Sequence, residues 1–129
     1  KNLLINKYIN NEIGKNTISS YKRAFNIIDQ ADKELRGVPD PVLFRQNDEK
    51  FLFDKINEIR KAFAVKEDKK NYESLLIKLS EMKPFTDNFF DNVKVNDENS
   101  DIKNNRLELL KMLCNTFDNF VNFSKLEGL

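Results

Sequence analysis

Residues 100–123 read SDIKNNRLELLKMLCNTFDNFVNF, and this stretch decides the fold class. Its hydrophobic residues recur at steps of three and four, which places them along one side of a helix. That side combines one charged residue with five apolar ones: Arg106, Ile102, Leu110, Leu113, Phe117 and Phe120. Ser100 is a good N-cap, and Asp101 complements the helix dipole. We therefore predict a long amphipathic helix over 100–123.

The same periodicity extends upstream and predicts further helices in the rest of the chain. They cover approximately residues 3–9, 17–35, 48–64, 69–81 and 86–92. Gly14, the two prolines that follow Gly37, and Pro84 should separate them, and Asp68 is the expected N-cap of the helix over 69–81. No convincing strand pattern is present. Because the connections are short, we expect an all-α bundle of five or six mostly antiparallel helices, forming one domain over residues 1–129.

Composition narrows the class of protein. The net charge of +1 creates no strong global field, so any contact with RNA needs a local basic patch. The chain has no histidine, which removes the usual general base and the commonest metal ligand. Its one cysteine excludes an intrachain disulfide and fits a cytoplasmic setting. We expect a cytoplasmic domain without catalytic residues or a metal site. Since it starts at Lys1 rather than Met, we also expect a piece of a longer chain.

Five blocks of the sequence, in order, resemble the beta subunit of bacterial glycyl-tRNA synthetase. Residues 84–97, PFTDNFFDNVKVND, look like that family's P-V-D-x-F-F-D-x-V-x-V-N. Residues 102–110, IKNNRLELL, are similar to L-R-A-N-R-L-x-L-L, and residues 123–128, FSKLEG, to F-S-R-I-E-G. Upstream, YKRAFNII at 21–28 resembles Y-R-R-A-A-N-I-L, and PDPVLF at 39–44 resembles V-D-P-A-L-L. The family's final domain belongs to the DALR group of helical anticodon binders. The DALR tetrad reads S-D-I-K here, at residues 100–103, which keeps the character of its last two positions.

The resemblance implies a function. In that family the alpha subunit carries the aminoacylation core and binds ATP, magnesium and glycine, within a heterotetramer of two alpha and two beta chains. The C-terminal domain of the beta subunit would hold the anticodon loop of glycine tRNA and support the ligase without catalysing the reaction. The anticodons for glycine carry cytosine at their second and third positions. Reading the edges of unpaired cytosines needs a basic surface that also carries asparagine.

Eight residues are the candidates for contact with the tRNA: Lys22, Arg23, Asn26, Asn92, Lys94, Lys103, Asn105 and Arg106. We assign Asn105 and Arg106 to bases or to the anticodon loop, and Lys22, Arg23 and Lys103 to phosphates. No residue is assigned to catalysis or to a metal.

Structural roles compete with these assignments. Arg106 lies on an apolar stripe and could instead pair with a buried carboxylate such as Asp91. Asn105 could cap or crosslink a neighbouring loop, and the cations of the helix over 17–35 could form an ordinary solvated face. At least one of Phe89 and Phe90 should be core, and Cys114 should be an inert buried thiol.

The alternative function is a helical protein-interaction or subunit-assembly domain without catalytic activity. The RNA hypothesis requires the candidate cations to gather on one face of the bundle.

Overall fold

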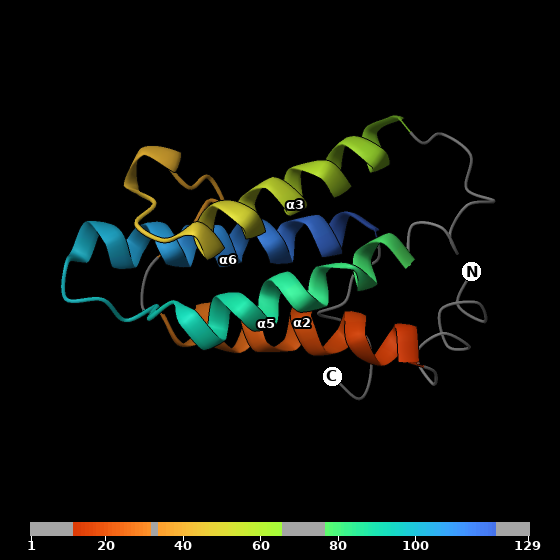
Figure 1. Cartoon of the computed structure of the whole chain (residues 1–129), viewed down its shortest axis with the longest axis horizontal. Coiled ribbons are helices and arrows are strands. Elements are labelled where there is room, and N and C mark those ends of the chain that lie inside the picture. The colour runs from red at the N-terminus through yellow and green to blue at the C-terminus, as the bar shows by residue number, and fades with distance from the viewer. Residues whose placement is uncertain (1–11, 32–33, 66–76, 121–129) are drawn as a thin grey trace.

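The computed structural model describes residues 12–31, 34–65 and 77–120. Four long helices dominate these residues (Figure 1): α2 (Glu12–Gln30), α3 (Asn47–Val65), α5 (Met82–Asn92) and α6 (Ser100–Phe120). One turn of 3-10 helix, η1 (Pro41–Leu43), precedes α3. The described residues contain no strand, so the predicted all-α class is confirmed. The predicted helix over 3–9 and most of the one over 69–81, with its N-cap Asp68, lie outside the described residues.

The four helices enclose one core. α2 packs on α5 and α6, and α3 packs on the same two helices. In Figure 1, α2 and α5 run in one direction, while α3 and α6 run in the other. The ends of α2 and α5 therefore lie at the same end of the bundle as the start of α6.

The core is made of the predicted apolar stripes. α6 buries Ile102, Leu110, Leu113 and Phe117, as its periodicity predicts. α3 buries Leu52, Ile56 and Ile59. α2 buries Tyr21, Ala24 and Ile28, whereas Ile18 and Phe25, predicted on the same side, are only partly buried at its margins.

Two predicted limits of α2 were wrong. The helix continues through Gly14, because a single glycine weakens a helix by only about 1 kcal/mol and does not end it. It then ends at Gln30 rather than Leu35. Beyond this end, the N–H groups of residues 36–38 bind a carboxylate on α6.

The helix predicted over 69–81 breaks at Glu81, as expected, but the next helix begins at Met82 rather than at residue 86. Pro84 lies in the first turn of α5, where a missing N–H costs nothing. The break falls three residues earlier, at Glu81, whose N–H still bonds the carbonyl oxygens of Ile77 and Lys78. A continuous helix would require Pro84 to donate to the carbonyl of Ser80, which proline cannot do.

The N-cap of α6 is Asn99 rather than the predicted Ser100. Its Oδ1 accepts hydrogen bonds from the backbone N–H groups of Asp101 at 2.9 Å and Ile102 at 3.2 Å. These are the donors that a capping side chain satisfies. In the described part of the chain, no helix is long and apolar enough to cross a membrane.

Candidate functional site

An open groove with a volume of about 520 Å³ runs along one face of α2. Its lining combines three cations with two polar residues and one apolar residue: Lys15, Lys22, Arg23, Ser19, Asn26 and Ile18. These positions repeat at helical spacing, opposite the buried face that contains Tyr21 and Ala24. The groove therefore brings together all three candidates from the upstream helix.

Arg23 connects this groove to α5. Its guanidinium Nη1 lies 3.3 Å from Oδ1 of Asp87, and its Cζ lies 4.3 Å from the ring centroid of Phe90. The second carboxylate oxygen of Asp87 accepts a hydrogen bond from Lys83 Nζ at 3.0 Å. Phe90 meets the fully buried Phe89 edge to face, with centroids 5.6 Å apart. The expectation that at least one of these two rings is core is thus confirmed by Phe89.

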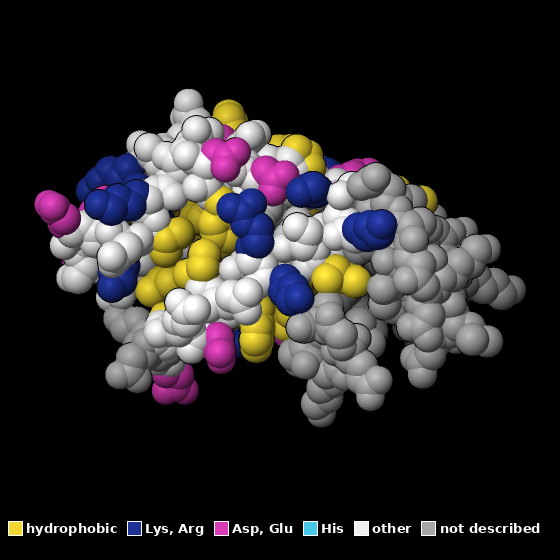
Figure 2. All heavy atoms as spheres, turned by 90° about the horizontal axis from the view of Figure 1, so that it is seen from below, with side chains coloured by type: hydrophobic (Ala, Val, Ile, Leu, Met, Phe, Trp, Pro, Cys, Tyr) yellow, Lys and Arg dark blue, Asp and Glu magenta, His cyan; other side chains and the backbone are white. Residues whose placement is uncertain are grey.

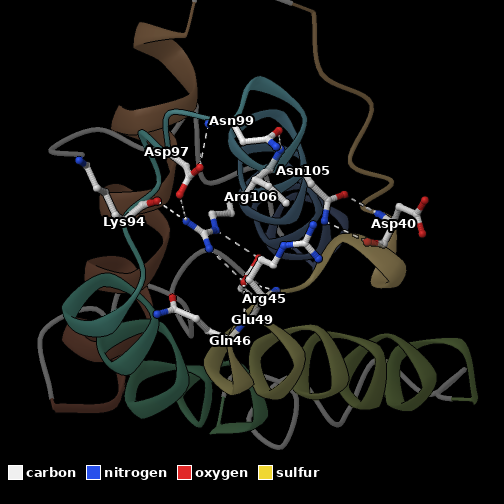
Figure 3. Close-up of polar contacts among 10 residues, drawn as sticks. Asp40, Arg45, Gln46, Glu49, Lys94, Asp97, Asn99, Asn105 and Arg106 are labelled. Carbon is white, nitrogen blue, oxygen red and sulfur yellow. Dashed lines mark hydrogen bonds and ion pairs between the residues drawn. The ribbon is translucent and has the colours of Figure 1, made fainter.

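A buried charge cluster lies at the start of α6 (Figure 3). Nη2 of Arg106 donates to Oε1 of Glu49 at 3.3 Å, and its Nε lies 3.2 Å from Oε2. Its Nη1 donates to the carbonyl oxygen of Lys94 and to Oδ2 of Asp97. The side chains of Arg106 and Glu49 are 5% and 0% exposed. Glu49, rather than the expected Asp91, is therefore the main partner of Arg106.

Glu49 also closes the turn that precedes α3. Its Oε1 accepts from the backbone N–H groups of Arg45 at 2.8 Å and Gln46 at 2.9 Å. One carboxylate thus satisfies two backbone donors and an arginine. Because Arg106 binds both this carboxylate and residues 94 and 97, it fixes the turn at residues 45–46 relative to the segment 94–97.

The next residues of α6 hold the segment between α2 and η1. Asn105 accepts from the N–H of Asp40 at 2.6 Å and donates to its carbonyl at 3.0 Å. Glu108 Oε1 accepts from three successive backbone N–H groups, those of Arg36, Gly37 and Val38. Asn105 therefore crosslinks a loop, which was the competing hypothesis for this residue.

The eight candidates fall into three groups. Asn105 and Arg106 are 5% and 4% exposed and bonded within the fold, so in this structure they present no side chain to an RNA. The α2 candidates share the groove. The other three flank the start of α6, outside the groove: Asn92, Lys94 and Lys103.

The three residues near α6 differ in their surroundings. Asn92 is exposed, and its amide donates to Asp48 Oδ2 on α3 at 2.9 Å. Lys94 is exposed, and its ammonium group points away from the buried cluster (Figure 3). Lys103 is half-buried in the first turn of α6.

Figure 2 shows the face formed on the side of α2 and α5. Lys and Arg side chains lie along its middle and at the end where α6 begins, with apolar side chains between them. Asp and Glu side chains lie on the same face, and further ion pairs form elsewhere on the surface. Burial alone would lower the pKa of Lys55, but hydrogen bonds to Glu81 and Glu58 outweigh it and raise that pKa.

The described residues include no group of three potential metal ligands.

Three residues of these sites were missed by the sequence reasoning. Lys15 precedes Lys22 by two helical turns, and extending the helix upstream would have included it. Glu49 stands on the apolar stripe of α3, three residues before Leu52, as Arg106 stands on that of α6. A charge on each of two apolar stripes was the available signal for their pairing. Glu108 carried no comparable signal.

Comparisons with known proteins agree with this architecture. Residues 17–126 match the DALR anticodon binding domain family. The chain is 36% identical over 122 residues to the glycine–tRNA ligase beta subunit of Rickettsia africae, an alignment that covers 95% of the chain and 18% of the relative. It is 37% identical to the protein of the same name from Rickettsia prowazekii over 123 residues, again 95% of the chain and 18% of the relative.

The protein of that name from Sulfurihydrogenibium sp. is 40% identical over 114 residues, which cover 88% of the chain and 16% of the relative. The chain thus spans less than a fifth of the length of these relatives. The family match covers α3, α5 and α6 completely and α2 from Thr17 onward. The chain belongs to the DALR anticodon binding domain family.

Proposed function

We propose that this chain is the anticodon-binding domain of a glycine–tRNA ligase beta subunit and contacts the anticodon loop of glycine tRNA. The observation that carries the proposal is the α2 groove, which joins Lys15, Lys22, Arg23 and Asn26 on one surface. The family membership and the names of the relatives support it. A chain with a net charge of +1 needs such a local concentration of cations to attract RNA.

Different residues of the groove contact the phosphates and the bases. Lys15 and Lys22 meet phosphates, which position an RNA without reading its sequence. Asn26 offers both a donor and an acceptor for the edge of an unpaired base. Lys94, Lys103 and Asn92 form a second contact near the start of α6. Asn105 and Arg106 act indirectly, by holding the backbone segments from which these side chains extend.

The remaining chemistry belongs to the parent enzyme. The domain supports ATP-dependent attachment of glycine to its tRNA by holding the anticodon, and it takes no part in catalysis. ATP, magnesium and glycine bind to the alpha subunit, within a cytoplasmic heterotetramer of two alpha and two beta chains. The likeness to beta subunits supports this arrangement.

A binding titration tests the proposal. The 129-residue chain is titrated with an RNA hairpin that carries a glycine anticodon, and with a hairpin changed only at the two cytosines. We expect tighter binding to the first, with a loss of about 1–3 kcal/mol for a lost base contact. Equal affinity for the two hairpins would contradict anticodon reading.

A charge variant tests whether the groove is the binding surface. Lys22→Met should weaken binding of both hairpins alike and flatten the log–log salt dependence by about 0.7–0.9. Lys61→Met, which removes an exposed lysine on α3, is the matched control and should change neither quantity. Equal effects of the two substitutions would show that the RNA does not bind at the α2 groove.

The second candidate function is subunit assembly. It is favoured by Val38, which precedes η1 and is 74% exposed, and by Val42, which lies within η1 and is 82% exposed. Such side chains gain stability when another protein surface covers them. In the full-length beta subunit, Val42→Ser would then weaken co-elution with the alpha subunit and leave RNA affinity unchanged. Co-elution that is unaffected would remove this candidate.

A further inference from the structure

The guanidinium group of Arg23 is held in a defined orientation at the surface. The ring of Phe90 supports it from one side, with Cζ 4.3 Å from the ring centroid, and Asp87 binds its Nη1 at 3.3 Å. The Arg23 side chain nevertheless remains 46% exposed, and it lines the α2 groove. A flexible side chain has thus been fixed while part of its surface stays accessible.

This environment suits a flat ligand better than a phosphate. Asp87 already compensates much of the charge of Arg23, which weakens its attraction for an anion relative to Lys22 in the same groove. The planar guanidinium can still bind a nucleobase by stacking, because nucleobases stack on arginine planes as they do on aromatic rings. Fixing the plane in advance lowers the entropic cost of that contact.

We propose that Arg23, supported by Phe90 and oriented by Asp87, is a stacking platform for one unpaired base of the bound RNA. This inference rests on the proposed function and assigns Arg23 to a base, rather than to the phosphate expected from the sequence. Ser19 and Asn26 lie one helical turn before and after the platform, where their polar groups meet the edge of the stacked base. Lys22 beside them meets its phosphate.

The decisive variant is Arg23→Lys, which keeps the charge and removes the plane. The probe is the glycine-anticodon hairpin, with 2-aminopurine placed at each unpaired loop position in turn. With the unsubstituted chain, fluorescence at one position should be quenched on binding. Arg23→Lys should abolish that quenching and weaken binding about tenfold, as the loss of one stacked base does.

Two controls separate stacking from charge. Arg60→Lys makes the same exchange at an exposed position on α3 and should leave both quenching and affinity unchanged. Heparin, a polyanion without bases, should bind the unsubstituted chain and the Arg23→Lys variant equally well. Phe90→Leu should reproduce the loss of quenching, with circular dichroism used to verify that the helices remain folded.

The outcomes are distinguishable. Quenching and affinity that survive in Arg23→Lys would overturn the platform and leave the proposed function standing. A parallel loss for heparin would assign Arg23 to direct guanidinium contacts with anionic groups rather than to a base, and would also overturn the platform. Failure of the unsubstituted chain to bind any hairpin at low salt would instead overturn the proposed function.

Discussion

Nε of Arg106 on α6 lies 3.2 Å from Oε2 of Glu49 on α3, although the two residues are 57 positions apart in the chain. Both are almost excluded from solvent, so Glu49 depends on Arg106 for compensation of its charge, while Arg106 also has the more distant Asp97. Removing one partner of such a pair leaves an uncompensated buried charge, which costs far more than the loss of a surface ion pair. This pair also fixes the turn before α3 and the segment before α6.

The first prediction concerns the charge of Glu49. Glu49→Gln keeps an oxygen that can accept from the backbone of Arg45 and Gln46. It leaves the buried Arg106 with only the partly exposed Asp97, 3.4 Å away, as a charged partner. We expect the free energy of unfolding to fall by about 3–5 kcal/mol, measured by urea denaturation.

Asp54→Asn is the matched control for this substitution. It removes the partner of Lys50 from a pair whose side chains are 66% and 57% exposed, and it should cost less than about 1 kcal/mol. Similar losses for the two variants would mean that the Arg106–Glu49 pair contributes no more than a surface contact.

The second prediction concerns Glu108, which accepts three backbone N–H groups from residues 36–38. Glu108→Ala leaves these donors without their acceptor and should destabilise the chain by about 1–3 kcal/mol. Glu108→Gln retains an oxygen at this position and should recover part of the loss. Amide hydrogen exchange at residues 36–38 should quicken in the alanine variant; unchanged exchange would show that another group protects them.

The third prediction concerns Gly37, which has φ +82°. A Cβ added there would lie 2.6 Å from Asn115 Nδ2 and 3.3 Å from the backbone of Met112 on α6. Because both the conformation and the space oppose a side chain, Gly37→Ala should lower the free energy of unfolding by more than about 1 kcal/mol. Val38→Ala, at an exposed neighbouring position, should stay within about 0.5 kcal/mol. Equal thermal midpoints for the two variants would contradict this account.

The fourth prediction concerns the thiol of Cys114. Burial, with a smaller contribution from the charge of Asp118, raises its pKa to about 12. At pH 8 the thiol should therefore resist alkylation by iodoacetamide in the folded chain and react readily in guanidinium chloride. Rapid alkylation under native conditions would show that α6 opens locally.

The same raised pKa predicts a pH dependence of stability. Folding favours the protonated thiol, and the unfolded value is about 8.5. The contribution of Cys114 to stability is therefore complete below pH ~8.5 and is lost as the pH rises toward 12. The free energy of unfolding should fall more steeply above pH ~8.5 in the unsubstituted chain than in Cys114→Ala. Parallel pH profiles would rule out this linkage.

The amino-acid sequence by itself determined the fold class and the apolar faces. The steps of three and four in α3 and α6 identify the residues that fill the core, because a helix repeats every 3.6 residues whatever packs against it. The resemblance of five sequence blocks to one family likewise depends on order along the chain. Both properties are read along the chain, so they can be recognised without knowing which helices pack against each other.

Only the tertiary structure decided what the polar residues do. Arg106 and Asn105 look like RNA ligands in the sequence, yet they bind Glu49 and the backbone of Asp40. In the sequence, Lys22 and Arg23 could equally form an ordinary solvated face, whereas in the structure Phe90 and Asp87 on α5 hold Arg23 in place beside Lys22 and Asn26. The physical reason is that hydrogen bonds and ion pairs act over a few ångströms in space. The chain reaches those distances between residues 57 or 65 positions apart only after its helices have packed.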